Sequence, residues 1–495
     1  MTKFHLTNFG CRASQADGAA LKRQLLDAGL AEAASRDESE IAVLNTCTVT
    51  ATADAEVRQI IRRIHRANPD CRILVTGCYA QRAAEEIAKL PGVAWVVGNS
   101  HKHTIADMVK KDSQVRIRDP AEQKTEGGSQ KAEGGSPNSE FRILNSQSLK
   151  AIPAPRLLTP DSRPTVLVGE ITEEFHFAPV LADDHTRPML KVQDGCDARC
   201  SFCIIPEVRG ASRSMAPEKV IEQVRELEQQ GYKEIVLSGI NLGSYGKDLD
   251  RRITFLGIVE RILSDTGIPR IRISSIELMD VSPALISLVA REPRMARHFH
   301  VPLQSGSDRI LRAMNRRYWT RHYADRIQAI HQQIPNCGIG ADVMVGFPGE
   351  TEEDHEKSLR FIESLPFTYL HVFPYSSRPG TAAAVRHDHL NGRIIHDRGQ
   401  EMRAVMKLKR AAFLETQIGR ILPSVTLDEE QDGERVALSS NYLKLVLPGT
   451  ETPANVLLEA RVGRVHGGVL YAFAESRVGE PSGLRRERET LPYKA

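Results

Sequence analysis

The run Cys196-Asp197-Ala198-Arg199-Cys200-Ser201-Phe202-Cys203 follows the apolar segment Met189 to Val192. Three and then two residues separate its cysteines, so the three thiols can reach one small inorganic centre. Structural zinc normally takes four protein ligands, and no fourth Cys or obvious His lies beside this run. Iron–sulfur clusters also usually take four cysteines, so three leave one iron open to a substrate or cofactor. The run therefore predicts such an open cluster, with a zinc knuckle or three unrelated thiols as the alternative.

The composition of the whole chain limits the class of protein in which this site can lie. A length of 495 residues predicts two to four domains, and 41% hydrophobic with 26% charged residues is typical of globular proteins. A net charge of +3 means that any affinity for nucleic acid must come from local basic faces. Eight clustered cysteines favour metal chemistry in a reducing compartment. No signal peptide and no long apolar run is found, so we expect a cytoplasmic protein without a membrane span.

Residues 1–112 alternate apolar runs with amphipathic segments, which predicts an open α/β sheet. Strands are expected at 4–9, 41–45 and 73–76, and each ends near a cysteine, namely Cys11, Cys47 and Cys78. Because sites in open α/β sheets form at the carboxyl ends of the strands, these thiols should converge. The alternative is three buried small side chains. Cys71 lies at the other end of its strand, roughly 20 Å from Cys78 at ~3.3 Å per residue, and is expected to be structural.

Residues 113–186 break this alternation. The tetrapeptide Glu126-Gly127-Gly128-Ser129 recurs as Glu133-Gly134-Gly135-Ser136 among Gln, Lys, Ser and Pro. Such a composition cannot bury enough apolar surface to offset the entropy of ordering, so it predicts a flexible linker or insertion. Within it, residues 166–171 are expected to be either a strand or a docked segment.

Residues 187–415 return to a regular strand–helix alternation. Strands are expected at 189–193, 234–238, 271–276, 299–303, 339–345 and 369–374, with helices between them such as 217–230 and 351–365. Six such units predict parallel strands with right-handed crossovers, in a partial barrel short of the eight strands of a closed one. Sites belong at the carboxyl ends of barrel strands, where the cluster loop also lies. Cys337 precedes the fifth strand and is expected to be structural.

The other strand ends of this barrel carry glycines and polar side chains. Taken singly, each segment is only a turn followed by a helix cap. Together with the cluster loop they predict a cofactor pocket, because glycine admits a ligand close to the backbone and Asn, Ser and Gln supply donors and acceptors. The candidate binding residues are Gly239, Asn241, Ser274, Glu277, Gln304 and Gly346.

The C-terminal part begins with a basic helical run at 391–410. Residues 416–475 then show strand patterns at 425–427, 435–438, 443–447 and 456–460, which predict a small all-β barrel. Residues 476–495 are expected to form a disordered basic tail.

These motifs together resemble the radical S-adenosylmethionine (SAM) methylthiotransferases. The resemblance rests on the two central motifs Cys196–Cys203 and Val345–Thr351, on Asn441–Leu445, and on the N-terminal motifs Phe9–Arg12, Asn45–Thr50 and Thr76–Gln81. It implies an α/β fold with an N-terminal open sheet, a central (βα)6 radical SAM barrel and a C-terminal TRAM barrel. It further implies two [4Fe–4S] clusters, with SAM bound at the second. The ligands would be Cys11, Cys47 and Cys78 for the auxiliary cluster, and Cys196, Cys200 and Cys203 for the cluster that cleaves SAM.

Within that family, the segments Asn8–Asp17 and Leu242–Leu249 are most similar to the branch that acts on N6-threonylcarbamoyladenosine. This similarity implies addition of a methylthio group at C2 of that adenosine, at position 37 of tRNA. One SAM would donate a methyl group to sulfur at the auxiliary cluster, and a second would supply the radical that activates C2. The alternatives are methylthiolation of isopentenyladenosine in tRNA or of a ribosomal-protein aspartate, and a non-enzymatic iron–sulfur or zinc RNA-binding protein.

The implied partners are the tRNA anticodon loop and an electron donor, and we expect a monomer. Residues 416–474 contain five Arg and Lys against seven acidic residues, so the terminal barrel is not basic. Phosphate contacts would therefore need the 391–410 helix, the Arg58 face of the first domain, or the tail.

Overall fold

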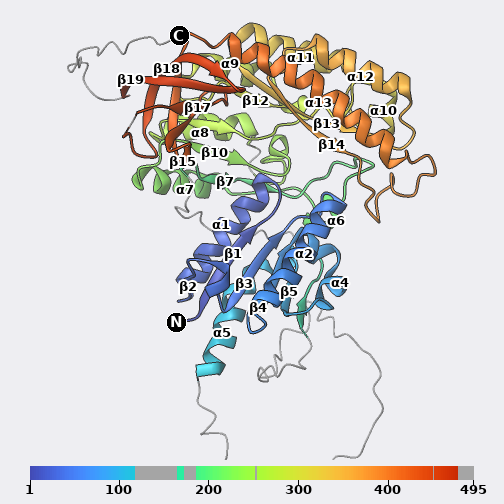
Figure 1. The fold of residues 1–495 in the computed structure, drawn as a ribbon, viewed down its shortest axis with the longest axis vertical. Helices are drawn as coiled ribbons and strands as arrows, with labels where there is room; N and C mark the ends of the chain where they lie inside the picture. Colours follow the sequence, from blue (N-terminus) through green and yellow to red (C-terminus); the bar gives the residue numbers. More distant parts are fainter. Residues whose placement is uncertain (118–163, 172–185, 251–252, 450, 478–495) are drawn as a thin grey trace, which may run out of the picture.

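A computed structural model describes residues 1–117, 164–171, 186–250, 253–449 and 451–477. Three parts follow one another along the chain: an N-terminal sheet with helices, a central half-barrel, and a closed C-terminal barrel (Figure 1). The predicted tail at 476–495 lies almost wholly outside the described residues, as does most of the predicted linker at 113–186. The fold class expected from the sequence is confirmed.

The N-terminal sheet is parallel throughout and has the strand order β2-β1-β3-β4-β5-β6. Its strands are β1 (Lys3–Asn8), β2 (Ala31–Glu32), β3 (Ile41–Thr46), β4 (Arg72–Gly77), β5 (Val93–Val97) and β6 (Thr165–Leu167). The helices are α1 (Arg12–Asp27), α2 (Ala51–Ala67), α3 (Cys78–Arg82), α4 (Ala84–Ala88) and α5 (Ile105–Ile117). The three strands expected from the sequence are all present, and their cysteines follow the carboxyl ends of neighbouring strands.

Strand β6 lies inside the stretch expected to be a linker. Its residues pair in parallel with β5, where Val166 lies opposite Val96. Gly169 is held as well, because its N–H donates to Ser100 Oγ and its carbonyl accepts from Gln81 Nε2. Residues 165–167 therefore belong to the sheet, so the strand alternative holds for the start of 166–171, and the docked alternative describes the part around Gly169.

The central part contains six parallel strands in two groups, β11-β10-β7 and β12-β13-β14. Single bridges from Ile271 to Met295 and from Ser275 to His300 join the groups into one curved wall. The strands are β7 (Met189–Lys191), β10 (Ile235–Ser238), β11 (Ile271–Ile273), β12 (His298–His300), β13 (Gly338–Val345) and β14 (Tyr369–Pro374). The helices outside it are α7 (Pro217–Gln229), α8 (Phe255–Asp265), α9 (Pro283–Arg291), α10 (Asp308–Ala313), α11 (Thr320–Gln333) and α12 (Glu352–Ser364).

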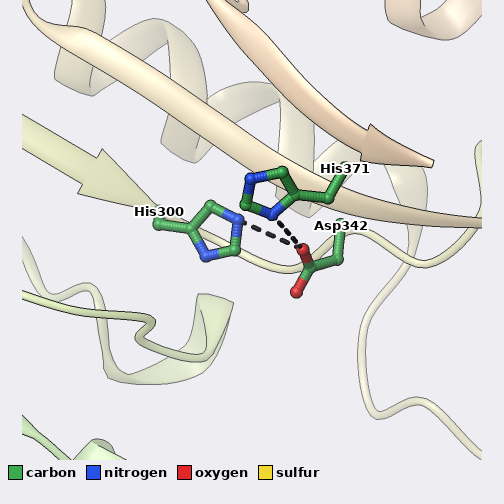
Figure 2. A group of neighbouring side chains, drawn as sticks. All are labelled: His300, Asp342 and His371. Atoms are coloured by element: carbon green, nitrogen blue, oxygen red, sulfur yellow. Dashed lines mark hydrogen bonds and ion pairs between the residues drawn. The ribbon is translucent and has the colours of Figure 1, made fainter. Parts of the chain in front are cut away.

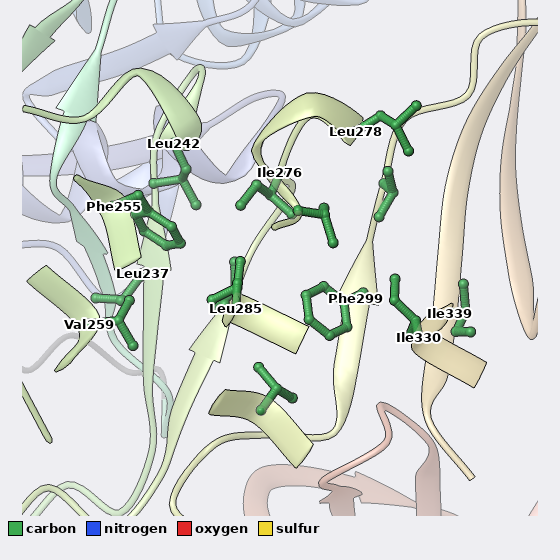
Figure 3. Packing of buried hydrophobic residues seen from close by; sticks show 14 of the residues in the cluster. Leu237, Leu242, Phe255, Val259, Ile276, Leu278, Leu285, Phe299, Ile330 and Ile339 are labelled. Atoms are coloured by element: carbon green, nitrogen blue, oxygen red, sulfur yellow. The ribbon is translucent and has the colours of Figure 1, made fainter. Parts of the chain in front are cut away.

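Side-chain alternation gives this wall two different faces. Leu237, Phe299 and Ile339 are buried in the main hydrophobic core, together with side chains of the surrounding helices (Figure 3). Neighbouring positions on the strands must point the opposite way, toward the interior of the half-barrel. Those positions carry polar groups, for example Arg272 and His298.

The long helix α13 (Gly392–Glu415) packs along the edge strand β14 and leads into the closed barrel. That barrel has the order β15-β16-β17-β19-β18, and β18 returns to pair with β15. Its strands are β15 (Ile421–Gln431), β16 (Glu434–Ser439), β17 (Lys444–Leu447), β18 (Leu457–His466) and β19 (Val469–Arg477). Arg272 joins the two barrels, because its guanidinium donates to the carbonyls of Ser439 and Ser440. No described helix is both long and apolar enough to cross a membrane.

Candidate functional site

The central cysteine loop is closed at its base by a short antiparallel pair. Strands β8 (Gln193–Asp194) and β9 (Arg213–Ser214) pair with each other, and the backbone N–H of Cys196 donates to the carbonyl of Gly210. Burial, together with the neighbouring thiols of Cys200 and Cys196, raises the pKa of the Cys203 thiol to about 12. The three sulfurs therefore share one partly buried space, as the spacing predicted.

Polar side chains from the barrel rim surround these sulfurs. Arg316 Nη1 donates to Cys200 Sγ at 3.4 Å, and the same guanidinium forms an ion pair with Glu277. Asn241 Nδ2 lies 3.8 Å from Cys196 Sγ, while its buried Oδ1 has no hydrogen-bond partner in the described part of the chain. Of the predicted cofactor residues, Asn241 and Glu277 are thus the two that the structure brings to the cysteine loop.

The other predicted cofactor residues have varied surroundings. Gly239 is close to Gln193 and Leu242, so that a Cβ there would lie 2.9 Å from Leu242, and Ser274 is buried at the end of β11. Gln304 adopts a positive φ of 68° and is tied to β13 by backbone hydrogen bonds. Gly346 is different: a Cβ there would meet Ile395 of α13 at 2.4 Å, so close helix packing is enough to require glycine. The roles of these residues in cofactor binding stay predictions.

The three N-terminal cysteines lie together at the carboxyl edge of the first sheet. Cys11 is the N-cap of α1, Cys47 follows β3 and Cys78 begins α3. Burial, together with the nearby thiols of Cys78 and Cys11, raises the pKa of the Cys47 thiol to about 12. Gly10 lets the backbone before Cys11 lie close to Cys47, because a Cβ at Gly10, whose φ is 96°, would lie 2.8 Å from Cys47 Sγ. Cys71 and Cys337 are buried elsewhere.

One buried arginine connects the two sets of cysteines. Arg209 is the last residue of α6 (Ile205–Arg209), which directly follows the central cysteine loop. Its Nε donates to Cys78 Sγ at 3.2 Å, and its Nη1 and Nη2 form ion pairs with Asp194 and Asp17. Cys78 also packs against Val208 and Ile204. The loop after the first barrel strand therefore helps to form the environment of the N-terminal set.

Both sets fit an iron–sulfur cluster. Thiolates are the soft ligands that such clusters take, and each set offers three sulfurs from a confined space. Arginine N–H groups at Cys200 and Cys78 suit thiolates, because charge-assisted donors stabilise the anion. Among described residues no fourth cysteine lies in either set, so one iron of each cluster would remain open.

No pattern in the sequence predicts a role for Arg209, Arg316, Asp17 or Asp194. Arg209 was visible as the residue before a glycine that follows the cysteine loop, but its partners come from distant segments. A second set was also missed: His300, Asp342 and His371 lie close together inside the half-barrel. An alternation of polar residues along otherwise apolar strands is the signal that could have found them.

Comparisons with known proteins agree with this arrangement. Residues 190–362 match the model of the Radical SAM superfamily, and residues 3–98 match the uncharacterized protein family UPF0004. The threonylcarbamoyladenosine tRNA methylthiotransferase MtaB of Bacillus subtilis is 34% identical over 466 residues, which is 93% of each chain. The tRNA-2-methylthio-N(6)-dimethylallyladenosine synthase of Pelotomaculum thermopropionicum is 32% identical over 84% of each chain. The radical SAM methyltransferase TsrM of Kitasatospora setae shares the fold, with a TM-score of 0.51 at 15% identity over 78% of this chain and 77% of its own.

Proposed function

The chain belongs to the radical SAM methylthiotransferases, and on that premise we propose that it adds a methylthio group to C2 of N6-threonylcarbamoyladenosine at position 37 of tRNA. The observation that carries the proposal is the pairing of two three-cysteine sets through Arg209. A protein that only bound RNA would need neither an open cluster nor a second one.

The two sets of cysteines are assigned different roles. Cys196, Cys200 and Cys203 would hold the cluster at which SAM binds, and Cys11, Cys47 and Cys78 would hold the auxiliary cluster. When bound, these clusters supply the electron for reductive cleavage of SAM and a site for the sulfur that is transferred. The chain itself fixes the sulfurs and shields two of them from water: Cys47 and Cys78 are buried, and Arg316 and Arg209 each donate to one sulfur.

The rim of the half-barrel is the proposed SAM site. Asn241 offers an unpartnered buried Oδ1 beside Cys196, and Glu277 offers a carboxylate oriented by Arg316. These groups would orient the polar parts of SAM, with Gly239, Ser274, Gln304 and Gly346 shaping the remaining rim. We assign the parts of the chain as residues 1–112 for the auxiliary cluster, 113–186 for a linker or insertion, 187–415 for radical SAM chemistry, 416–475 for the TRAM barrel and 476–495 for a tail.

A basic groove beside the half-barrel supports binding of the tRNA backbone. A cavity of about 530 Å³ lies between α13, β14 and the closed barrel, and its lining includes five basic side chains: Arg187, Arg403, Lys407, Arg410 and Lys444. Of these, Arg187 pairs with Glu234 and Lys444 with Glu429, whereas the three on α13 are exposed to solvent. Exposed cations on one helix face can contact successive phosphates. The Arg58 face is a weaker candidate, because Arg58 itself is bonded to Tyr79 and Glu86.

The proposed partners follow from this chemistry. The target base lies in the anticodon loop, where bases can be unstacked and turned outward. Reductive cleavage of SAM requires an external electron donor. We propose that the protein acts as a monomer in the cytoplasm, where tRNA and a reducing environment are both present.

Mass spectrometry of tRNA nucleosides from cells with and without the gene tests the proposal. The methylthio derivative of N6-threonylcarbamoyladenosine should disappear from the deletion strain, and the unthiolated nucleoside should accumulate. Loss of the methylthio derivative of isopentenyladenosine instead would assign the chain to the other tRNA branch. No change in either nucleoside would remove the tRNA assignment.

A further inference from the structure

Three ionisable side chains converge inside the half-barrel, apart from both sets of cysteines. His300, Asp342 and His371 come from the neighbouring strands β12, β13 and β14, and Asp342 lies opposite His371 in the register (Figure 2). His300 Nε2 is 3.3 Å and His371 Nδ1 is 3.1 Å from the same carboxylate oxygen, Oδ1 of Asp342. Figure 2 shows both imidazole rings turned toward this carboxylate.

His300 is fixed and only partly satisfied. Its Nδ1 shares a hydrogen bond of 2.7 Å with Ser275 Oγ, and its side chain is only 5% exposed to solvent. Its Nε2 forms an ion-pair contact with Asp342 but no hydrogen bond of good geometry within the described part of the chain. Buried polar atoms normally find a partner, so His300 Nε2, which lies beside Asp342 without a well-formed hydrogen bond, can still bond to a ligand that reaches this carboxylate.

The opposite side of the cluster is open. The His371 side chain retains 51% of its exposure, and Asp342 retains 24%. His371 also lines the basic groove between α13 and the closed barrel, together with Tyr369. A nucleotide whose phosphates lie in that groove can therefore bring its base past the edge strand β14 to these residues.

The ionisation of Asp342 is set by its neighbours. Although burial raises it, the neighbouring imidazoles of His300 and His371 hold the pKa of Asp342 well below its usual range. Asp342 is therefore a carboxylate at neutral pH. The cluster offers an anionic acceptor flanked by imidazole groups that can donate, all on one wall.

We propose that His300, Asp342 and His371 recognise the threonylcarbamoyl substituent of the substrate adenosine and reject an isopentenyl one. This inference rests on the proposed function and names the residues that select the substrate. The threonylcarbamoyl group carries ureido N–H and hydroxyl donors for Asp342, and a carboxylate that accepts from the exposed His371. The place of the cluster suits this role, because Ser275 adjoins Ser274 of the proposed SAM rim.

The isopentenyl group has no polar atom to offer. Placed against this wall, it would strip water from Asp342 and the imidazoles without replacing the hydrogen bonds. Sites built to hydrogen-bond a substrate reject analogues that lack the polar group by on the order of 10⁴-fold, and by less where water still reaches the site. Because His371 is half exposed, we expect a preference of about 10²-fold or more.

The test is equilibrium binding of two synthetic anticodon stem-loops to the holoenzyme without reductant. They are identical except for threonylcarbamoyladenosine or isopentenyladenosine at the target position. Asp342→Asn and His371→Leu should each lower the preference for the first stem-loop by at least about tenfold. The control His396→Ala changes an exposed histidine of α13 that does not line the groove, and it should leave the preference unchanged. Iron content and the thermal midpoint verify that each variant is folded.

The outcomes distinguish failure of the proposed function from failure of the substrate-selecting role of His300, Asp342 and His371. If the wild type modifies threonylcarbamoyladenosine but folded Asp342→Asn and His371→Leu keep its preference, the inference is wrong and the proposed function stands. If the wild type modifies isopentenyladenosine instead, the proposed function fails and the inference fails with it. A third outcome is a tightly bound divalent metal ion in addition to the iron of the iron–sulfur clusters. If that metal ion is lost in His371→Leu, then His300, Asp342 and His371 hold a cation, which would also overturn the inference.

Discussion

The guanidinium of Arg209 donates from Nε to Cys78 Sγ across 3.2 Å, although the two residues are 131 positions apart in the chain. The arginine ends the helix that follows the loop proposed to hold the SAM cluster, and the cysteine belongs to the set proposed for the auxiliary cluster. This contact couples the two candidate sites physically, because the loop that holds one also supplies a charged donor to the other.

Replacing Arg209 by Gln should destabilise the protein and weaken the auxiliary site. The change removes one of the two cations that Asp17 and Asp194 share and leaves Lys191 between them, so the loss should stay below the about 3–5 kcal/mol typical of a buried charge left without any partner. Chemical denaturation of the cluster-free protein measures the loss. Arg209→Lys keeps the charge but not the fork of donors, so it should recover part of the stability. Equal stability of Arg209→Gln and the wild type would contradict this account of the network.

The pH dependence of stability should report on Glu234. Burial alone would raise its pKa, but Arg272, Arg187 and Arg270 lower it to about 2 from 4.5. A lowered folded-state pKa means that its stabilisation is complete above the unfolded value and is lost as pH falls from about 4.5 toward 2. Unfolding free energies of the cluster-free protein between pH 7 and 3 measure this decline. In Glu234→Gln the decline should be shallower, and an unchanged slope would rule out Glu234 as its source.

The basic groove should supply affinity for RNA without base specificity. Changing Arg403 and Lys407 together to Glu should weaken binding of any anticodon stem-loop, because both exposed cations can contact phosphates. The slope of log affinity against log salt should fall by about one for each contact removed. Arg393→Glu is the matched control, since that exposed arginine lies on the same helix outside the groove. If the groove variant and the control show the same affinity and the same salt slope, the RNA backbone does not lie in the groove.

The general architecture followed from the sequence because hydrophobic periodicity and strand-end cysteines are local signals. The six strands of the half-barrel lie close to their expected ranges, and the first sheet contains the three strands named in advance. The sequence alone could not decide whether 166–171 is a strand or a docked segment. The partner strand β5 lies about 70 residues away in sequence, so no local pattern indicates the pairing with β6. Strand β15 extends beyond the expected range 425–427 at both ends, and Asp428, Glu429 and Glu430 continue it with exposed side chains.

The candidate site was only partly predictable for a similar reason. Cysteine spacing indicates candidate ligands, since all three central thiols come from one loop. The partners of those ligands come from elsewhere: Arg316 reaches Cys200 from a turn 116 residues away, and Arg209 reaches back to the first sheet. Contacts that depend on how separate parts pack against one another leave no spacing pattern, so they emerged only from the structure.

The cysteine variants test the central claim most directly. Cys11→Ala and Cys200→Ala should be compared with the wild type in anaerobic reactions containing SAM, a reductant and tRNA with threonylcarbamoyladenosine. The account predicts that Cys200→Ala forms neither 5′-deoxyadenosine nor thiolated nucleoside, whereas Cys11→Ala still forms 5′-deoxyadenosine but no methylthio product. Methylthio product from Cys11→Ala at the wild-type rate, or 5′-deoxyadenosine from Cys200→Ala, would contradict it.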